Sequence, residues 1–482
     1  MDEFSMWEDK IVFRNGMFLY LNGKGNNSFI CKEGAGKIEA DYYEYQARMD
    51  VDRGGVHPET CYPARGFMKN ENGQWEYKKP YKIEELIGDR AVIPIVEEFE
   101  IPSIIDGRIT LNVIRREAFY HCDRLRKLVI PKSIKVIEGY AFEGCINLSE
   151  IVVESEIVKI EENAFSDTAY YHKEENWENG AIYLGDWLLK VKPETEGRLL
   201  VKEGTIGIAD GAFAKCNKLT EIILPETVDY IGRNAFADCG SLTDISFPNQ
   251  IKGFGAGALR GCTSLENVEL PIGVKDISGM FQNNQKLRRV HLPEGIEVIG
   301  RDAFENCINL CEIQLPGSIK SIARTAFANT GYVNEKANWK DGALYLCHWL
   351  IDVDKSLSGK FFIEDGTVGI ADATFGKVFL GKSCDKLSDI EMPETLKYIG
   401  IGAFCGCVKL KKVRIPSGVE VLSQDLFRDC TNLKEVWIPK GIKSIGNWPF
   451  FRCEKVTAIV AAGSFAESYM KKNKIKYRVY EG

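Results

Sequence analysis

Residues 141–163, AFEGCINLSEIVVESEIVKIEEN, are one copy of a unit that decides the fold. Cleaner copies read A-F-x-x-C-x-x-L-x-x-I-x-L-P-x-x-I-x-x-I-G. The phenylalanine returns after 23 residues, for example at Phe404, Phe427 and Phe450. With Leu259 in the phenylalanine slot, the anchor positions are 119, 142, 165, 213, 236, 259, 281, 304, 327, 375, 404, 427 and 450. A fixed period of this length indicates a repeat array.

A unit of 23 residues with apolar side chains at these offsets cannot bury its hydrophobic side alone. It must stack on copies of itself, which predicts a solenoid. The L-x-x-I-x-L-P stretch, as in residues 219–225 and 410–416, alternates like a short strand, and its proline ends that strand. We expect the Ala-Phe segment to form a tight helical turn. The predicted fold class is therefore mainly β, a solenoid of stacked strand-and-turn coils.

Two intervals break the period, and they are copies of each other at an offset of 162 residues. Residues 180–190 read G-A-I-Y-L-G-D-W-L-L-K, and residues 342–352 read G-A-L-Y-L-C-H-W-L-I-D. Each reads as two short strands around a tight turn, so we expect a β-hairpin that projects from the solenoid. Trp187 and Trp349 either pack onto the solenoid or bind a partner, and packing is the favoured interpretation.

The chain divides into three expected regions. Residues 1–88 lack the repeat and carry Asn15-Gly16, Asn22-Gly23 and Asn72-Gly73 turn pairs among many aromatic residues, which predicts a small β-rich domain. Residues 89–460 form the solenoid, with inserts near 167–198 and 329–360. Residues 461–482 form a C-terminal cap.

Composition excludes several classes of protein. The 482 residues include 45% hydrophobic ones, enough for a core, which excludes wholesale disorder. With 62 Lys and Arg against 69 Asp and Glu, the net charge is −7, and no long basic run suggests nucleic-acid binding. No apolar run is long enough to span a membrane. The N-terminal MDEFSMWEDK lacks the pattern of a secretory signal, so the sequence by itself predicts a cytoplasmic protein.

Ten of the fifteen cysteines occupy one slot that follows the phenylalanine anchor: 122, 145, 216, 239, 262, 307, 384, 407, 430 and 453. Stacked strands lie about 4.8 Å apart, within reach of a disulfide, but identical slots set their Cβ vectors side by side and pair poorly. We therefore expect a ladder of buried thiols that donate to loop backbone. Metal, disulfide or redox roles are the alternatives.

Motifs for chemistry are weak. His57 and Cys61 make at most half of a metal site. Residues 253–257, GFGAG, imitate a dinucleotide loop but lack its strand-loop-helix context. No Ser-His-Asp or Cys-His arrangement can be argued. We expect no catalytic residue, no metal and no cofactor.

The repeat register identifies one continuous surface. If the apolar residues of L-x-x-I-x-L face the core, the residues two and four after the first leucine face outward on one sheet. Charges there give either a solvated face that resists aggregation or a protein-binding face. His291 and Trp437 are large groups on it and our choice of anchors. We name this surface the sheet face, and its candidate partner-binding residues are Glu221, Asp244, Glu269, Arg289, His291, Glu312, Asp389, Glu391, Lys412, Arg414 and Trp437.

From about residue 91 to 482, the fixed order of Ala-Phe, Cys, Leu, Ile, Pro and Ile-Gly resembles the BspA-like leucine-rich repeat family. The stretches 101–114 and 461–466 look like that family's first coil and C-terminal cap. The resemblance implies a non-enzymatic bacterial interaction or adhesion protein, displayed at the cell surface and bound to host or neighbouring-cell proteins. Two other hypotheses are an intracellular repeat scaffold and a repeat array that targets a small catalytic N-terminal domain.

Overall fold

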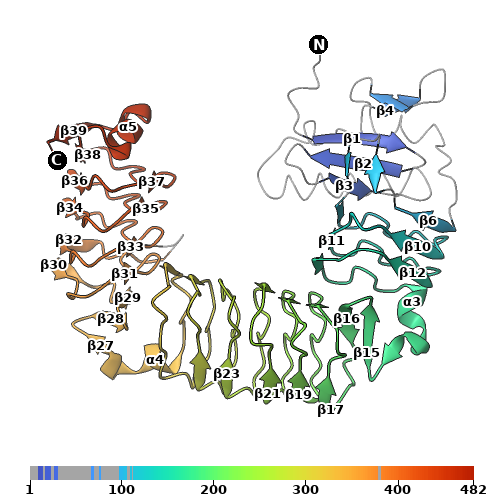
Figure 1. Cartoon of the computed structure of the whole chain (residues 1–482). Coiled ribbons are helices and arrows are strands. Elements are labelled where there is room, and N and C mark those ends of the chain that lie inside the picture. Colours follow the sequence, from blue (N-terminus) through green and yellow to red (C-terminus); the bar gives the residue numbers. More distant parts are fainter. Residues whose placement is uncertain are drawn as a thin grey trace. The chain divides into compact units, whose positions relative to one another are not determined.

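The computed structural model (Figure 1) describes the backbone of residues 9–14, 17–22, 27–30, 67–69, 75–77, 97–101, 103–105, 109–110, 112–377 and 381–481. Side chains are described for 97–101, 103, 112–377 and 381–481. Two compact units can be distinguished. The first contains Met1–Lys192, Gly204–Ala212 and Tyr230–Gly232, and the second contains Pro193–Glu203, Phe213–Asp229 and Arg233–Gly482. Each unit contains stacked repeat coils, so the predicted solenoid of mainly β structure is confirmed.

A coil contributes two short strands. The L-x-x-I-x-L stretch forms a first strand and the I-x-x-I-G stretch a second, each in a parallel ladder with the matching strand of the next coil. The first unit has first strands β6 (Glu98–Glu100), β10 (Lys127–Ile130) and β12 (Glu150–Val153). Its second strands are β9 (Val113–Ile114), β11 (Val136–Ile137), β13 (Lys159–Ile160), β16 (Trp187–Val191), β18 (Gly207–Ile208) and β20 (Tyr230–Ile231).

The second unit continues the same pattern. Its first strands are β17 (Gly197–Leu200), β19 (Leu219–Ile223), β21 (Asp244–Ser246), β23 (Asn267–Glu269), β24 (Arg289–His291), β30 (Ser358–Phe362), β32 (Lys386–Glu391), β34 (Lys412–Arg414), β36 (Glu435–Ile438), β38 (Thr457–Ala461) and β39 (Tyr477–Tyr480). Its second strands are β22 (Gly253–Phe254), β25 (Val298–Ile299), β26 (Ser321–Ile322), β29 (Trp349–Val353), β31 (Gly369–Ile370), β33 (Tyr398–Ile399), β35 (Val421–Leu422) and β37 (Ser444–Ile445). In Figure 1, β17, β19 and β21 lie side by side, as their parallel pairing requires.

The remaining elements lie at the ends of the array and in the two long intervals. At the N-terminal end are β1 (Asp9–Arg14), β2 (Met17–Asn22), β3 (Asn27–Ile30), β4 (Phe67–Lys69), β5 (Trp75–Tyr77), β7 (Ile104–Ile105) and β8 (Ile109–Thr110). β3 pairs in parallel with β9, so these strands join the second ladder of the first unit. At the C-terminal end, helix α5 (Phe465–Lys472) begins at Ser464, whose side chain accepts a hydrogen bond from the backbone N–H of Glu467.

The core is a column of phenylalanine rings, one from each coil. Within the second unit, Phe304 lies 5.3 Å from Phe281 and 5.4 Å from Phe327 between ring centroids, with nearly parallel planes. All thirteen predicted anchors are buried, including Leu259, which substitutes for a ring. Parallel aromatic stacking across coils adds to the area that each ring buries. The anchors therefore hold successive coils in register.

The Ala-Phe segment differs from the expected helical turn. It forms turns in which the residues two before and two after the anchor adopt positive φ in most coils, so no helix is assigned there. The earlier position is held by Glu117, Tyr140, Asn163, Gly211, Asn234, Gly257, Gly279, Asp302, Ala373, Gly402, Asp425 and Trp448, and the later one by His121, Gly144, Asp167, Lys215, Asp238, Gly261, Asn283, Asn306, Asn329, Gly406, Asp429 and Arg452. Asn, Asp and Gly prevail because they tolerate this conformation best. We call this segment the anchor turn.

The two long intervals share one arrangement. A threonine takes the cysteine slot and caps a short helix: Thr168 begins α3 (Ala169–His172), and Thr330 begins α4 (Gly331–Asn334). A 3-10 turn follows each helix, at Glu174–Asn176 and Lys336–Asn338, and after it come β14 (Trp177–Glu178) and β15 (Ala181–Leu184), or β27 (Trp339–Lys340) and β28 (Ala343–Leu346). β15 then pairs antiparallel with β16, and β28 with β29, so both predicted hairpins are present.

The hairpins do not project as expected. The second strand of each hairpin belongs to the second ladder, since β16 pairs in parallel with β18 and β29 with β31. Trp187 and Trp349 pack inside, exposed by 2% and 4%. The packing interpretation of these two rings is confirmed. The prediction of a projecting hairpin was wrong because each tryptophan ring lies over Gly207 or Gly369 of the next strand, where no Cβ is in the way.

Candidate binding surfaces

The cysteine slot forms a row of buried thiols. All ten row cysteines are free and buried, as expected. Cys145 donates to the carbonyl of Phe119 at 2.9 Å, one coil away, and Cys453 does the same to Phe427 at 2.9 Å. Cys239, Cys262, Cys307, Cys407 and Cys430 donate to phenylalanine carbonyls in the same way. The thiols therefore bind backbone and act structurally.

Burial changes the acidity of these thiols. Desolvation raises the pKa of Cys262 and of Cys307 to about 12, far above the ordinary thiol value of about 8.5. Below about pH 8.5, folded and unfolded thiols are both protonated. Above it, the unfolded chain loses protons first, so stability falls as the pH rises toward the folded pKa.

We therefore expect the row cysteines to resist alkylation in the native protein. At pH 8, iodoacetamide followed by peptide mass spectrometry modifies the exposed Cys311 and Cys347 and spares the row until urea is added. The thermal midpoint falls progressively above about pH 9. Alkylation of Cys262 or Cys307 in the folded protein would contradict this account.

One coil departs from the cysteine row. Asn284 occupies the slot three residues after Phe281 and is fully buried, and neither its Nδ2 nor its Oδ1 has a hydrogen-bond partner among the described residues. An unsatisfied buried polar group costs about 1–3 kcal/mol. This coil is also one residue shorter before its anchor, since Leu259 and Phe281 are 22 positions apart.

Replacing Asn284 by cysteine is expected to stabilise the protein by about 1–3 kcal/mol, because it removes two unsatisfied polar atoms and extends the thiol row. Urea unfolding followed by circular dichroism measures the change. The matched control is the reverse swap in the next coil, Cys307→Asn, which is expected to destabilise. A lower unfolding midpoint for Asn284→Cys would contradict the prediction.

The sheet face has the predicted alternation. Val268, Val290 and Val413 point into the core, while every candidate residue on the face is exposed or half-buried. Trp437 is 43% exposed and lies beside Tyr480, with 5.8 Å between ring centroids. Glu312 is exposed but lies outside the assigned strands.

Several charges of the sheet face are paired across neighbouring strands. Arg198 pairs with Glu221 at 3.3 Å and Lys412 with Glu435 at 2.8 Å, and Lys360 pairs with Glu391. Surface pairs of this kind contribute little stability. They do reduce the net acidity that the sequence suggested.

Sequence reasoning missed four residues of this face. Arg198 and Leu200 lie on β17, and Lys360 and Phe362 lie on β30, the first strands that follow the two long intervals. Leu200 and Phe362 are 61% and 60% exposed, and Lys360 Nζ lies 4.6 Å from the centroid of the Phe362 ring. The expected strand register at Leu199 was the available signal, because it places both flanking residues outward.

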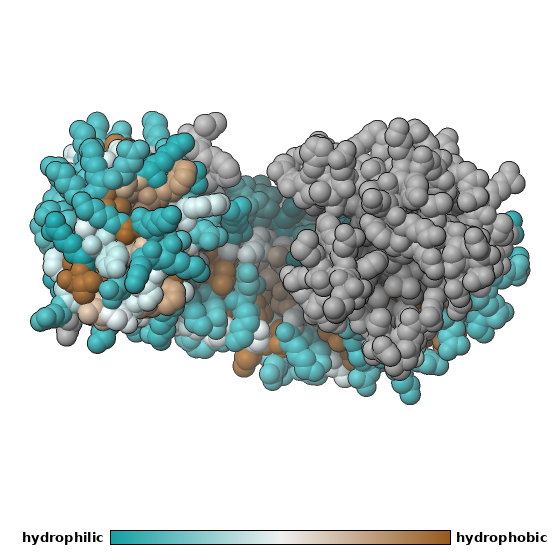
Figure 2. All heavy atoms as spheres, turned by 90° about the horizontal axis from the view of Figure 1, so that it is seen from above, coloured by the Kyte–Doolittle hydropathy of each residue, from teal (hydrophilic) through white to brown (hydrophobic). Residues whose placement is uncertain are grey.

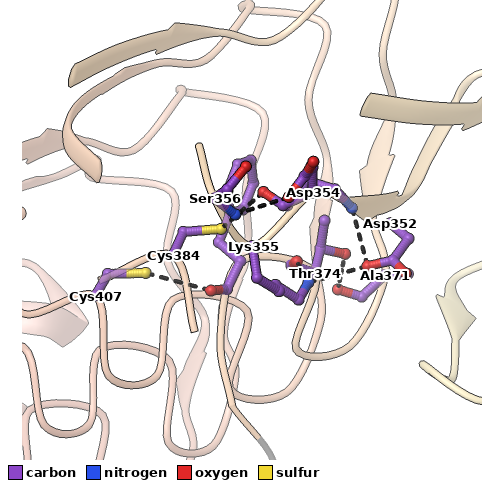
Figure 3. Close-up of polar contacts among 10 residues, drawn as sticks. Asp352, Asp354, Lys355, Ser356, Ala371, Thr374, Cys384 and Cys407 are labelled. Carbon is purple, nitrogen blue, oxygen red and sulfur yellow. Dashed lines mark hydrogen bonds and ion pairs between the residues drawn. The ribbon is translucent and has the colours of Figure 1, made fainter. Parts of the chain in front are cut away.

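The second hairpin block contains a buried polar cluster (Figure 3). Lys355 extends toward the Asp352 carboxylate, at 2.9 Å, and toward the carbonyl of Thr374. Position 352 corresponds to Lys190 in the first block, where Lys190 Nζ donates to the carbonyl of Gly211 at 2.8 Å. An ammonium group thus satisfies an anchor-turn carbonyl in both blocks. The cluster is structural.

Two further searches bear on function. Within the described residues, no group of three or more His, Cys, Asp and Glu side chains is arranged to hold a metal ion. No helix in that same part of the chain is both long and apolar enough to cross a membrane. His57 and Cys61 lie outside the described residues.

Comparison with known proteins identifies the repeats. A family model described as "BspA type Leucine rich repeat region" matches residues 105–186, 205–334 and 370–474, in six copies. No curated protein matches the chain significantly.

Solved structures with a similar fold come from several bacteria. A leucine-rich repeat protein from Bacteroides ovatus is 21% identical, over 80% of this chain and 92% of that one, with a TM-score of 0.29. A leucine-rich cell surface protein from Faecalibacterium prausnitzii is 17% identical, over 97% of both chains, with a TM-score of 0.25. The pneumococcal vaccine antigen PcpA is 15% identical, over 98% of this chain and 99% of that one, with a TM-score of 0.23. Since the repeat match alone covers more than half of the sequence, this chain belongs to the BspA-type leucine-rich repeat family.

Proposed function

We propose that this protein is a non-enzymatic interaction module that binds a partner protein through its sheet face. One observation carries the proposal: charged side chains on the central strands stand exposed and unused. Among the described residues, no ion pair engages Asp244, Glu269, Arg289, His291, Glu312 or Arg414. Exposed charges on a rigid sheet are ready to pair with a partner at little cost in conformational entropy.

Large exposed side chains support the same surface. Leu200, Phe362 and Trp437 are each more than 40% exposed on first strands. Interfaces draw most of their binding energy from a few large, central side chains surrounded by polar ones. A solenoid presents such groups along an extended surface.

Two settings remain for this module. The family resemblance and the cell-surface description of the Faecalibacterium protein favour adhesion. An intracellular scaffold is the alternative. Protease shaving of intact cells of the native host, followed by detection of this chain, separates them: cleavage supports adhesion, and protection sinks it.

Site-specific photo-crosslinking in the native host tests the sheet face. A benzoylphenylalanine at His291 is expected to give a discrete crosslinked product, and one at Lys336, in the 3-10 turn after α4, serves as the control. The triple variant Asp244→Lys, Glu269→Lys, Arg414→Glu is expected to abolish the product from position 291. Equal products from both positions, or a product that survives the triple variant, would remove the sheet face from the proposal.

A further inference from the structure

A groove lies on the anchor-turn edge of the second unit, away from the sheet face. Its volume is about 960 Å³, and it is lined by the anchor turns of the coils of Phe304, Phe327, Phe375, Phe404 and Phe427. The second hairpin block contributes Val333, Leu344 and Ile351 to it. Of the apolar lining, Val333 is half-buried and Ile401 is 51% exposed, so both are open to a ligand.

Most carboxylates of the groove are already engaged inside the protein. Asp352 pairs with Lys355 at 2.9 Å, and Asp425 with Arg428 at 3.3 Å. Asp429 pairs with Lys377 and with Arg452, both at 3.5 Å. These carboxylates bring no free negative charge to the groove.

Asp372 is engaged as well. Its Oδ1 accepts the backbone N–H of Ile401 at 2.7 Å. Burial raises the pKa of this carboxyl group, although the Arg301 charge opposes the shift. The side chain therefore acts as part of the wall.

Two guanidinium groups of the groove are available. Arg301 and Arg324 each stand three residues before an anchor, on neighbouring coils, at the same place in the repeat. Neither guanidinium makes a hydrogen bond or an ion pair with any residue that the structure describes. Two like charges held on adjacent coils repel each other, and a bound carboxylate relieves that repulsion through bidentate hydrogen bonds.

The next coil adds an aromatic pair to the same edge. Phe451 follows Arg428 in the stack, with the Asp429 N–H donating to the Phe451 carbonyl at 2.8 Å. Arg428 and Arg452 lie over the Phe451 ring at 5.0 Å and 5.4 Å from its centroid. Trp448, beside them in sequence, is 59% exposed, and Phe451 is 42% exposed. In Figure 2, hydrophobic residues emerge among hydrophilic ones on the C-terminal coils seen from above.

Trp448 holds an unusual conformation for its residue type. Its φ is +52°, at the anchor-turn position where most other coils have Asn, Asp or Gly. A bulky residue in the left-handed region costs stability. Backbone strain at an exposed aromatic residue is a reason to look for a binding role.

From these observations we propose that the anchor-turn groove binds an acidic, apolar peptide segment of another protein. Arg301 and Arg324 bind its carboxylates, Val333 and Ile401 contact its apolar side chains, and Trp448 and Phe451 receive its end. A phosphate polyanion fits less well, because the apolar lining gives it nothing and the wall carboxylates oppose it. This site is separate from the sheet face and does not depend on it.

Selection from a phage-displayed library of random dodecapeptides tests the proposal on the full chain. Enriched sequences are expected to combine Asp or Glu with large apolar residues. The most enriched peptide, labelled with fluorescein, is then titrated by anisotropy. The double variant Arg301→Gln, Arg324→Gln is expected to weaken its binding at least tenfold, and binding to the parent protein is expected to weaken with added salt.

The control variant is Arg289→Gln on the sheet face, which is expected to leave peptide affinity unchanged. If Arg289→Gln weakens binding and the double variant does not, the peptide binds the sheet face, and the groove proposal falls while the proposed function stands. Absence of acidic residues from the enriched peptides overturns the proposal. Equal competition by a (dT)12 oligonucleotide or by inorganic phosphate overturns it too, in favour of a general anion site.

Trp448→Asn separates a binding role from a structural one. Asparagine suits positive φ, so the variant is expected to raise the thermal midpoint, and loss of the aromatic ring is expected to weaken peptide binding at least threefold. Trp437→Asn, on the sheet face, is the matched control and is expected to leave peptide binding unchanged. A more stable Trp448→Asn protein with unchanged affinity would overturn the aromatic end of the site.

Discussion

Replacing Phe304 by alanine is expected to lower the free energy of unfolding by about 3–5 kcal/mol. Phe304 is fully buried between the rings of Phe281 and Phe327. Its removal leaves a cavity and also breaks the column on both sides, so two coil interfaces lose contacts at once. In a solenoid each coil is stabilised mainly by its neighbours, which makes an interior anchor more costly to lose than a terminal one.

The matched control for this prediction is Phe304→Leu. The chain already uses leucine in this slot at Leu259, which is fully buried, so the leucine variant is expected to cost about 1.5 kcal/mol or less. Urea unfolding followed by far-UV circular dichroism measures both. Equal losses for the alanine and leucine variants would contradict the role of the column, and a terminal anchor, Phe450→Ala, is expected to cost less than Phe304→Ala.

The second large effect is expected at Gly369. A Cβ at this position would lie 2.4 Å from a ring carbon of Trp349, well inside van der Waals contact. The ring cannot easily move, because its other neighbour is Tyr398, with centroids 5.8 Å apart and nearly parallel planes. Gly369→Ala is therefore expected to cost about 3 kcal/mol, at the upper end for overpacking.

Two comparisons isolate the cause. Gly317→Ala is the matched control, because its Cβ would meet its nearest atom only at 3.8 Å, and it is expected to be nearly neutral. In a Trp349→Leu background, Gly369→Ala is expected to cost clearly less, which a double-mutant cycle measures. The equivalent Gly207→Ala beside Trp187 is expected to repeat the result. An unchanged penalty in the leucine background would mean that the ring is not the obstacle.

Much of the fold is predictable here because the repeat is regular. A 23-residue period places Phe, Cys, Leu and Ile at fixed offsets, and each copy confirms the others. The burial of the anchors, the thiol row and the outward rows of the sheet face follow from that register. The candidate residues of the sheet face are accordingly at the surface, from Glu221 to Trp437.

The departures occur where the period stops. Thr168 and Thr330 take the cysteine slot, and a short capped helix replaces the expected first strand. Their local sequence signal, a capping threonine three residues after the anchor, was present but ambiguous. The position of the hairpins was not readable at all, because it depends on glycines that follow Trp187 and Trp349 by 20 residues in sequence.

The sequence by itself determined the repeat, the two faces of the first strands and the absence of any recognisable catalytic arrangement. Periodic burial encodes these directly, since each coil repeats the same choice of core and solvent. Only the tertiary structure decided which charges are paired, such as Arg198 with Glu221, and which are free, such as Arg301 and Arg324. The groove on the anchor-turn edge likewise exists only in three dimensions, because its walls come from five coils that are distant in sequence and adjacent in the stack.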